Sequence, residues 1–219
     1  MPQPREFFNR GALEVAPDLL GCLLLARSAE GEGAVVVRIT EVEAYTGPAD
    51  PASHAYRGQT ARNKVMFGPP GHAYIYFTYG MHHAINVVCM PEGTAEAVLV
   101  RAGEIVEGVE LARGRRTSSR GDVDLARGPG RLARALELTL AVDGADLCDP
   151  DGPLFLEPGK PVEGTLIRTG PRTGISKAAD LPWRFHIHGD PTVSPYRRAK
   201  GAGPAPSTGP AAPAAGRRP

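Results

Sequence analysis

The stretch "AVVVRITEVEAY", residues 34–45, is an apolar, β-branched run that ends in two carboxylates and a tyrosine. This composition predicts a β-strand. A second apolar run, "CLLLARS" at residues 22–28, precedes it, and the turn "AEGEGA" joins the two, so the pair predicts a β-hairpin. Glu43 then falls at the end of a strand, a short Pro-rich loop before His54.

A second hairpin is predicted from "HAYIYFTYGMHHAINVVCM", residues 72–90. Alternation along its first strand places Tyr74 and Tyr76 on one face and Ile75 and Phe77 on the other. The turn at "TYGM" then puts Tyr79 at the tip of the hairpin.

Helices and loops are predicted around these hairpins. A helix is predicted near residues 12–20, a strand at 97–102, and an exposed loop at "RGRRTSSRGD", residues 113–122, which lacks periodicity. "RGPG" introduces a further helix, "RLARALEL", at residues 131–138. We expect a single domain over residues 1–198 and a disordered Pro/Ala/Gly-rich tail over residues 199–219, because the tail has almost no apolar side chains to bury.

Length and composition favour a single globular domain. The chain has 219 residues with 42% hydrophobic content, enough for one well-buried core. Its three cysteines are odd in number and far apart, so they support neither a disulfide framework nor a Cys-rich zinc site. No signal peptide and no membrane-spanning run are visible, so we expect a cytoplasmic protein without a membrane partner.

Charge is unevenly distributed although the net charge is only +1. Residues 1–52 hold four arginines against eight acidic residues, whereas residues 53–134 hold eleven basic residues against seven acidic ones. Most of the basic residues are arginine, which suits bidentate phosphate contacts. A general compositional bias toward Arg, Ala, Gly and Pro explains the arginines equally well.

Several familiar chemistries find no support in the sequence. No stretch matches the Walker phosphate loop, the dinucleotide-binding glycine fingerprint or the nucleophile elbow. His82 and His83 are adjacent, so on a strand they point to opposite faces and cannot both bind one metal. We therefore expect neither a metal nor an organic cofactor.

Four segments together resemble the alkyladenine (3-methyladenine) DNA glycosylase family. They are "ITEVEAYTGPADPASHAYRGQTARNKVMFGPPGHAYIYFTYGMHHAINVV" at 39–88, "AVLVRAGEIVEG" at 97–108, "LARGPGRL" at 125–132 and "GPRTGISKAADLPWRFHIHGDPTVS" at 170–194. The resemblance runs from about Gly11 to Ser194. It implies a mixed α/β single domain with a curved, largely antiparallel sheet, flanking helices and a protruding hairpin that enters the DNA minor groove.

The resemblance also implies a reaction and a partner. The partner is double-stranded DNA with damaged purines, and the reaction is hydrolysis of the N-glycosidic bond of an alkylated or deaminated purine flipped out of the duplex. This is the chemistry of a monofunctional glycosylase of base excision repair, and the resemblance implies a nucleoid-associated monomer. It passes through an oxocarbenium-like sugar, so one fixed carboxylate can stabilise positive charge and accept a proton from the attacking water.

Matched position by position, the resemblance assigns Glu43 as the catalytic acid residue and Arg101 as the arginine that helps to hold the water. The main-chain carbonyl of Thr173 would be the water's third partner, although the family more often has an aliphatic residue there. Residue pattern alone leaves a plainer interpretation open, in which Glu43 is a strand-edge carboxylate paired with Arg38 or Arg101. Glu41 shares the face of Glu43 but does not occupy the catalytic position.

The remaining assignments concern the base and the DNA. Tyr45, His54 and Tyr76 match positions that stack on and read the flipped base, and Asn86 matches the position that presses against the exocyclic amine of guanine. Tyr79 matches the residue that fills the gap left by the flipped nucleotide. Phosphate contacts are predicted for a further pair of residues, Arg62 and Lys64.

Two other functions compete with this one. The hairpin could belong to a non-catalytic binder of damaged or bent DNA, and the pocket could belong to a small-molecule nucleoside hydrolase. Tyr79, which would fill the gap in the duplex, argues against the nucleoside hydrolase. The pair of Glu43 and Arg101 argues against the non-catalytic binder.

Overall fold

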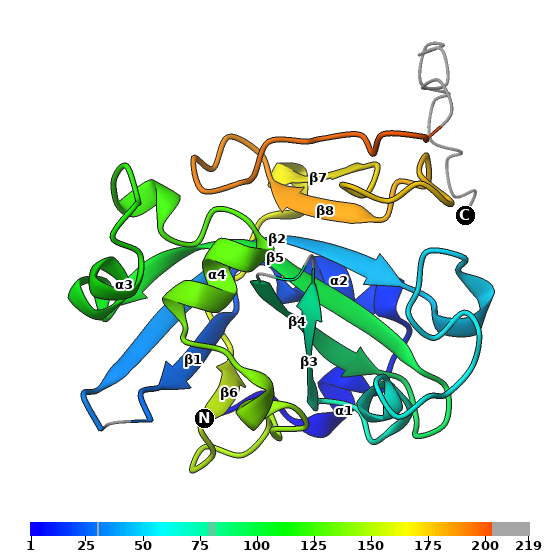
Figure 1. Cartoon of the computed structure of the whole chain (residues 1–219), viewed down its shortest axis with the longest axis horizontal. Coiled ribbons are helices and arrows are strands. Elements are labelled where there is room, and N and C mark those ends of the chain that lie inside the picture. Colours follow the sequence, from blue (N-terminus) through cyan, green and yellow to red (C-terminus); the bar gives the residue numbers. More distant parts are fainter. Residues whose placement is uncertain (30, 79, 81, 203–219) are drawn as a thin grey trace, which may run out of the picture.

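The computed structural model describes residues 1–29, 31–78, 80 and 82–202. Within these residues, eight strands form one sheet in which every pair is antiparallel (Figure 1). Its main path is β3-β4-β5-β2-β1-β6, with β8 paired to β2 and β7 to β8. The strands are β1 Leu23–Arg27, β2 Ala34–Tyr45, β3 Ala73–Thr78, β4 His82–Cys89, β5 Glu96–Glu107, β6 Leu154–Glu157, β7 Ile167–Gly170 and β8 Arg184–Ile187.

Strand β2 is the centre of this sheet because it pairs with β1, β5 and β8. Its register against β5 shifts between Ile39 and Glu41 and again between Glu41 and Val42. Such bulges bend a strand and increase its twist. Glu43 lies opposite Leu99 of β5 and Arg184 of β8, so the charged end of the strand is enclosed by the sheet on both sides.

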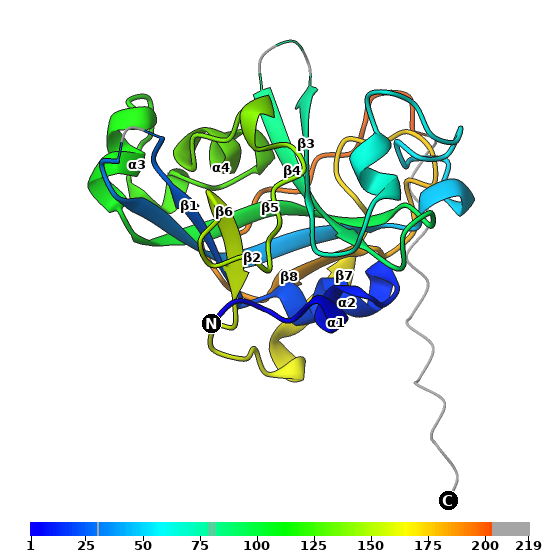
Figure 2. The same cartoon turned by 90° about the horizontal axis from the view of Figure 1, so that it is seen from below.

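Helices cover the two faces of the sheet. Figure 2 shows α1 (Arg5–Phe8) and α2 (Ala12–Leu19) on one face, and α3 (Val109–Arg115) and α4 (Pro129–Ala135) on the other. Helix α2 buries residues spaced by three and four positions, which is the pattern of an amphipathic helix that packs against a core. These residues are Ala12, Val15, Ala16 and Leu19.

The predicted second hairpin is present as β3 and β4, which lie side by side as an antiparallel pair (Figure 2). Its alternation is as predicted. Ile75 enters the main hydrophobic core, whereas Tyr74 and Tyr76 pack in a second, smaller cluster. Phe77, on the face of Ile75, is 45% exposed. Tyr79, which the sequence predicts at the tip, lies outside the described residues.

Three predictions from sequence need correction. The loop predicted over residues 113–122 is wrong at both ends, because α3 continues to Arg115 and a 3-10 helix spans Asp122–Asp124. Helix α3 forms since Ala112 has a buried place in the core. Helix α4 begins before residue 131, at Pro129, whose fixed φ suits a first helical position, and it ends at Ala135. Strand β5 continues past residue 102 to Glu107.

The extent of the domain remains a prediction, since residues 203–219 of the expected tail are not described. The mixed α/β class and the antiparallel sheet are confirmed. A search of the described helices finds none with the length and apolar character needed to span a bilayer.

Candidate active site

A cavity of about 190 Å³ lies where the end of β2 meets the hairpin β3–β4. An apolar cavity of about 150 Å³ in another protein holds benzene, so this one is large enough for a flat heterocycle. Its walls come from β2, the loop after β2, the hairpin, β5 and the loop after β7. The lining residues are Glu43, Tyr45, Ala52, Ser53, His54, Met66, Tyr74, Tyr76, Ala84, Asn86, Leu99, Arg101, Pro129, Thr173, Gly174 and Ile175.

Glu43 lines this cavity although its side chain is fully buried. Its carboxylate accepts hydrogen bonds from the Thr173 backbone N–H at 2.6 Å and from the Tyr45 hydroxyl at 2.9 Å. Nη1 of Arg101 lies 3.2 Å from Oε1. A buried carboxylate needs such partners, because desolvation of an unpaired charge is costly. Arg38, the other partner considered from sequence, instead pairs with Glu104 and Asp190.

The second carboxylate of β2, that of Glu41, is held by structural contacts. Glu41 accepts from Nε of Arg101 at 3.0 Å, from Nε of Arg184 at 2.6 Å and from the Ser194 N–H at 2.7 Å. Burial raises the pKa of Glu41, but the charges of Arg101 and Arg184 outweigh burial and leave it lowered. Glu41 does not line the cavity, so it can anchor Arg101 but cannot itself reach a ligand there.

Arg101 therefore bridges the two carboxylates, and its side chain is only 8% exposed. Burial lowers the pKa of Arg101, but the neighbouring charges of Glu43 and Glu41 raise it by more. The guanidinium stays charged and is held in one orientation by two acceptors.

Thr173 donates its backbone N–H to Glu43, whereas the resemblance assigned its carbonyl to the catalytic water. Its Oγ1 is buried and has no hydrogen-bond partner among the described residues. The role of the Thr173 carbonyl stays a prediction.

Aromatic rings form one wall of the cavity. Tyr74 and Tyr76 are stacked with centroids 5.4 Å apart, and His54 meets Tyr76 edge-on at 4.5 Å. His54 Nδ1 lies 3.1 Å from the Tyr74 hydroxyl. Burial and the positive charge of Arg62 lower the pKa of His54, so its imidazole is neutral near pH 7. The sequence assigned Tyr76 but not Tyr74, although their two-residue spacing on one strand face was the available signal.

Tyr45 forms another part of the wall at the end of β2. Burial and the charge of Glu43 raise the pKa of Tyr45 well above its ordinary value. Its hydroxyl therefore remains protonated and donates to Glu43. Asn86, 6% exposed, lines the cavity from β4, where it pairs with Tyr74 of β3.

The residues assigned to DNA phosphates lie outside the cavity. Arg62 is exposed and donates to the carbonyl of Phe77 at 2.9 Å, next to the end of β3. Lys64 is exposed at the start of the 3-10 helix Lys64–Phe67. Contact of either residue with a DNA phosphate stays a prediction.

No group of three His, Cys, Asp or Glu side chains within the described part of the chain is arranged to hold a metal ion. Cys22, Cys89 and Cys148 are free thiols. The expected lack of a cofactor stays a prediction.

Comparison of the sequence with known proteins shows which family the chain resembles. The model of the methylpurine-DNA glycosylase family matches residues 6–191. A protein of Streptomyces avermitilis named "Putative 3-methyladenine DNA glycosylase" is 62% identical over 198 residues, covering 90% of this chain and 92% of its own length. A protein of Leifsonia xyli with the same name is 53% identical over 207 residues, covering 90% and 94%. One of Rhodopseudomonas palustris is 50% identical over 193 residues, covering 88% and 90%.

The fold and the matches define a DNA-repair hydrolase that acts on N-glycosyl bonds. The chain belongs to the methylpurine-DNA glycosylase family.

Proposed function

We propose that the chain excises alkylated or deaminated purines from double-stranded DNA by flipping the nucleotide into the cavity and hydrolysing its N-glycosidic bond with a water activated by Glu43. One observation carries this proposal. Glu43 is fully buried in the sheet and still lines a cavity of a size suited to a base. A carboxylate is costly to bury, and this one is kept where a flipped nucleotide would meet it.

Hydrogen bonding leaves Glu43 able to act as a base. A carboxylate has about four lone-pair sites, and three donors, Tyr45, Arg101 and Thr173, occupy the carboxylate of Glu43. One site is left for a water molecule. As the glycosidic electron pair leaves with the base, the water oxygen bonds to the sugar carbon and its proton passes to Glu43.

The same carboxylate stabilises the sugar. Positive charge that develops on an oxocarbenium-like sugar is attracted to Glu43, and the low dielectric of a buried site strengthens this attraction. Arg101 is paired with Glu41 as well as with Glu43. It therefore orients the Glu43 carboxylate, while its single positive charge does not neutralise both carboxylates.

The aromatic wall suits a flat purine. Tyr45, His54 and Tyr76 offer ring surfaces to a flipped base, and each stacking contact is worth about 1 to 3 kcal/mol. Neutral His54 does not repel a cationic alkylpurine. Asn86 lines the cavity, where it would exclude the exocyclic amine of guanine and so spare undamaged DNA.

The hairpin β3–β4 is the proposed DNA-inserting element. It forms part of the cavity wall through Tyr76 and Asn86, and Tyr79 between its strands would fill the gap left by the flipped nucleotide. Arg62 and Lys64 are exposed near the hairpin and the cavity, where they would contact phosphates. We expect the enzyme to act as a monomer.

Substitution of Glu43 by Gln tests the proposal. Glu43→Gln keeps the size and removes the charge, so single-turnover excision of hypoxanthine or ethenoadenine from a duplex should fall by at least about 10² to 10⁴-fold. Binding of the damaged duplex, measured by fluorescence anisotropy, should persist. Glu104→Gln on β5 is the matched control, because Glu104 is half exposed and pairs with Arg38 away from the cavity.

Near-parental excision by Glu43→Gln would overturn the catalytic assignment. The competing functions give other results in the same assay. A non-catalytic binder would retain the duplex and release no base even in the parent protein, and a nucleoside hydrolase would cleave the free nucleoside as readily as the duplex.

A further inference from the structure

Arg172, which precedes Thr173, is the largest of the fully buried side chains that the structure describes. Its guanidinium forms a two-pronged ion pair with Asp50, in which Nη2 donates to Oδ1 at 2.9 Å and Nη1 contacts Oδ2. Nη1 also donates to the carbonyl of Ala44 at 3.0 Å. Its Nε has no hydrogen-bond partner among the described residues.

Aromatic rings surround the same guanidinium. Its central carbon lies 4.5 Å from the ring centroid of Tyr45 and 5.0 Å from the ring of Trp183. Tyr45 lines the cavity, whereas Arg172 does not. The guanidinium therefore covers a side of the Tyr45 ring that is turned away from the cavity.

Arg172 thus contacts, or is bonded to, two of the residues that donate to Glu43. The Tyr45 hydroxyl belongs to the ring on which the guanidinium lies, and the Thr173 N–H is the next residue along the chain. Ala44, whose carbonyl Arg172 holds, stands between Glu43 and Tyr45 on β2.

Asp50 extends this arrangement to the loop after β2. Its Oδ1 also accepts from the Ala52 N–H at 3.0 Å, and Ala52, Ser53 and His54 line the cavity. The ion pair therefore joins the loop that carries His54 to the loop that carries Thr173.

From these contacts we propose that Arg172 and Asp50 are positioning residues for the excision reaction, which orient Tyr45 and Thr173 so that both donate to Glu43 while the cavity stays open. This inference rests on the function proposed above. Lysine cannot replace Arg172 here, because its ammonium neither binds a carboxylate in two places nor stacks flat on a ring.

A purely structural role is the alternative. Buried ion pairs are weak evidence for stability, since the desolvation cost offsets the attraction. A structural role predicts loss of stability without a selective loss of chemistry. A positioning role predicts a slower chemical step, because a displacement of about 1 Å at a reacting group can cost about 10²-fold.

The test compares Arg172→Lys with Arg116→Lys in the full-length protein. Arg116 is also buried and also donates to a backbone carbonyl, that of Leu125, and it does not line the cavity. We expect Arg172→Lys to lower the single-turnover excision rate on an ethenoadenine duplex by roughly 10- to 100-fold. The Kd for that duplex should stay near the parental value, and Arg116→Lys should excise at the parental rate.

A double-mutant cycle separates positioning from structure. Tyr45→Phe keeps the ring and removes the bond to Glu43. If Arg172 acts through this bond, the combined loss of Arg172→Lys and Tyr45→Phe should be smaller than the product of the single losses. Losses that multiply, or an Arg172→Lys rate equal to that of Arg116→Lys, would overturn the proposal.

Two further results keep the outcome clear. If Arg172→Lys does not fold by circular dichroism, Asp50→Asn takes its place, because it keeps the size of the side chain and the acceptor for Ala52. If Glu43→Gln remains active, the proposed function fails; if Glu43→Gln is inactive and Arg172→Lys is as fast as the parent, only the positioning role fails.

Discussion

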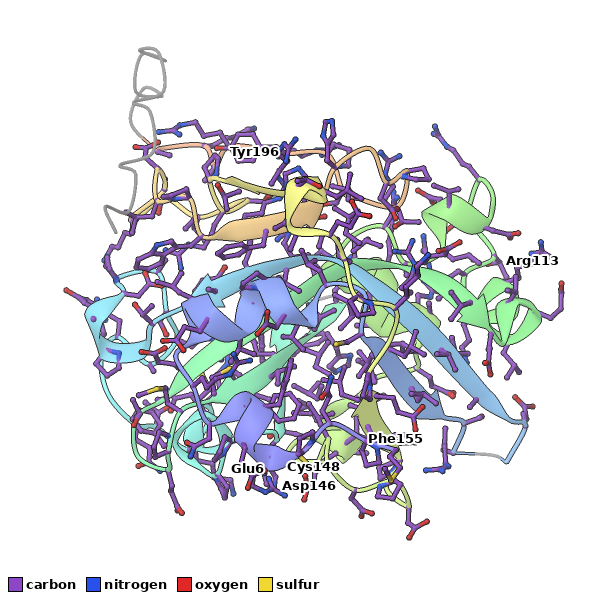
Figure 3. All side chains as sticks on the ribbon, turned by 180° about the vertical axis from the view of Figure 1, so that it is seen from behind. Glu6, Arg113, Asp146, Cys148, Phe155 and Tyr196 are labelled. Carbon is purple, nitrogen blue, oxygen red and sulfur yellow. The ribbon has the colours of Figure 1, made fainter. Side chains whose placement is uncertain are left out.

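Two sets of arginines carry the same charge in very different surroundings. The first set comprises Arg113 and Arg131 of the α3–α4 segment, residues 109–135, which are about half exposed and pair with acidic side chains, and Arg113 lies at the outer edge of the molecule (Figure 3). Around the cavity, the side chains of Arg101, Arg172 and Arg184 are at most 8% exposed. Water and salt screen the first set, and neither reaches the second.

The two sets of arginines differ in whether their ion pairs hold segments of the chain in position. An exposed pair can break and re-form in water at little cost, so it holds nothing in place. A buried guanidinium must keep its acceptors, and it therefore holds the segments that carry those acceptors. The buried arginines tie β2 to β5, to β8 and to the loop after β7.

The largest effect that would sharpen this contrast is expected from Glu41→Gln. The change leaves Arg101 and Arg184 without their shared carboxylate in a buried place, and loss of one partner of a buried pair costs about 3 to 5 kcal/mol of unfolding free energy. Urea unfolding measures it. A loss no greater than that of the exposed control Glu104→Gln would show that the buried network behaves like the surface pairs.

The sequence could predict the elements that depend on local pattern. The β-branched run of β2, the alternation of β3 and the spacing of α2 are properties of neighbouring residues, and all three elements are present. The resemblance named seven residues that the structure brings around one cavity. They are Glu43, Tyr45, His54, Tyr76, Asn86, Arg101 and Thr173.

The supporting residues could not be predicted in this way. Arg172 and Asp50 are 122 positions apart, and Arg184 is 143 positions from Glu41. No periodicity links residues at such separations, and a count of arginines does not tell which are buried. The predicted loop over 113–122 failed for a related reason, because the helical end of α3 depends on a tertiary place for Ala112.

A smaller effect is expected from acid. The pKa of Glu41 is lowered in the folded protein, so its contribution to stability is complete above its ordinary value of 4.5 and is lost as pH falls through the folded value. His54 has a lowered pKa too, so some stability is already lost below 6.5 in the parent and in Glu41→Gln alike. The difference in unfolding free energy between the two proteins should therefore be constant above about pH 4.5 and should narrow below it. A difference that stays constant down to about pH 3 would mean that Glu41 does not carry this charge.

The smallest effect is expected from Arg113→Ala. Its acceptors are exposed as well, with 82% of the Glu110 side chain and 53% of the Asp122 side chain in contact with solvent. Alanine also favours a helix slightly more than arginine, and this offsets the lost attraction near the end of α3. The thermal midpoint should change by no more than about 1 °C, because exposed ion pairs contribute little.

Salt sharpens this last test. If Arg113 meets only its acidic neighbours, the parent and Arg113→Ala should bind the damaged duplex with the same dependence on salt concentration, because the number of phosphates neutralised is the same. A shallower dependence in the variant would instead place Arg113 on a DNA phosphate. That outcome would give one exposed arginine a role in DNA binding. A drop of several degrees in the thermal midpoint would show instead that even exposed ion pairs hold the α3–α4 segment in place.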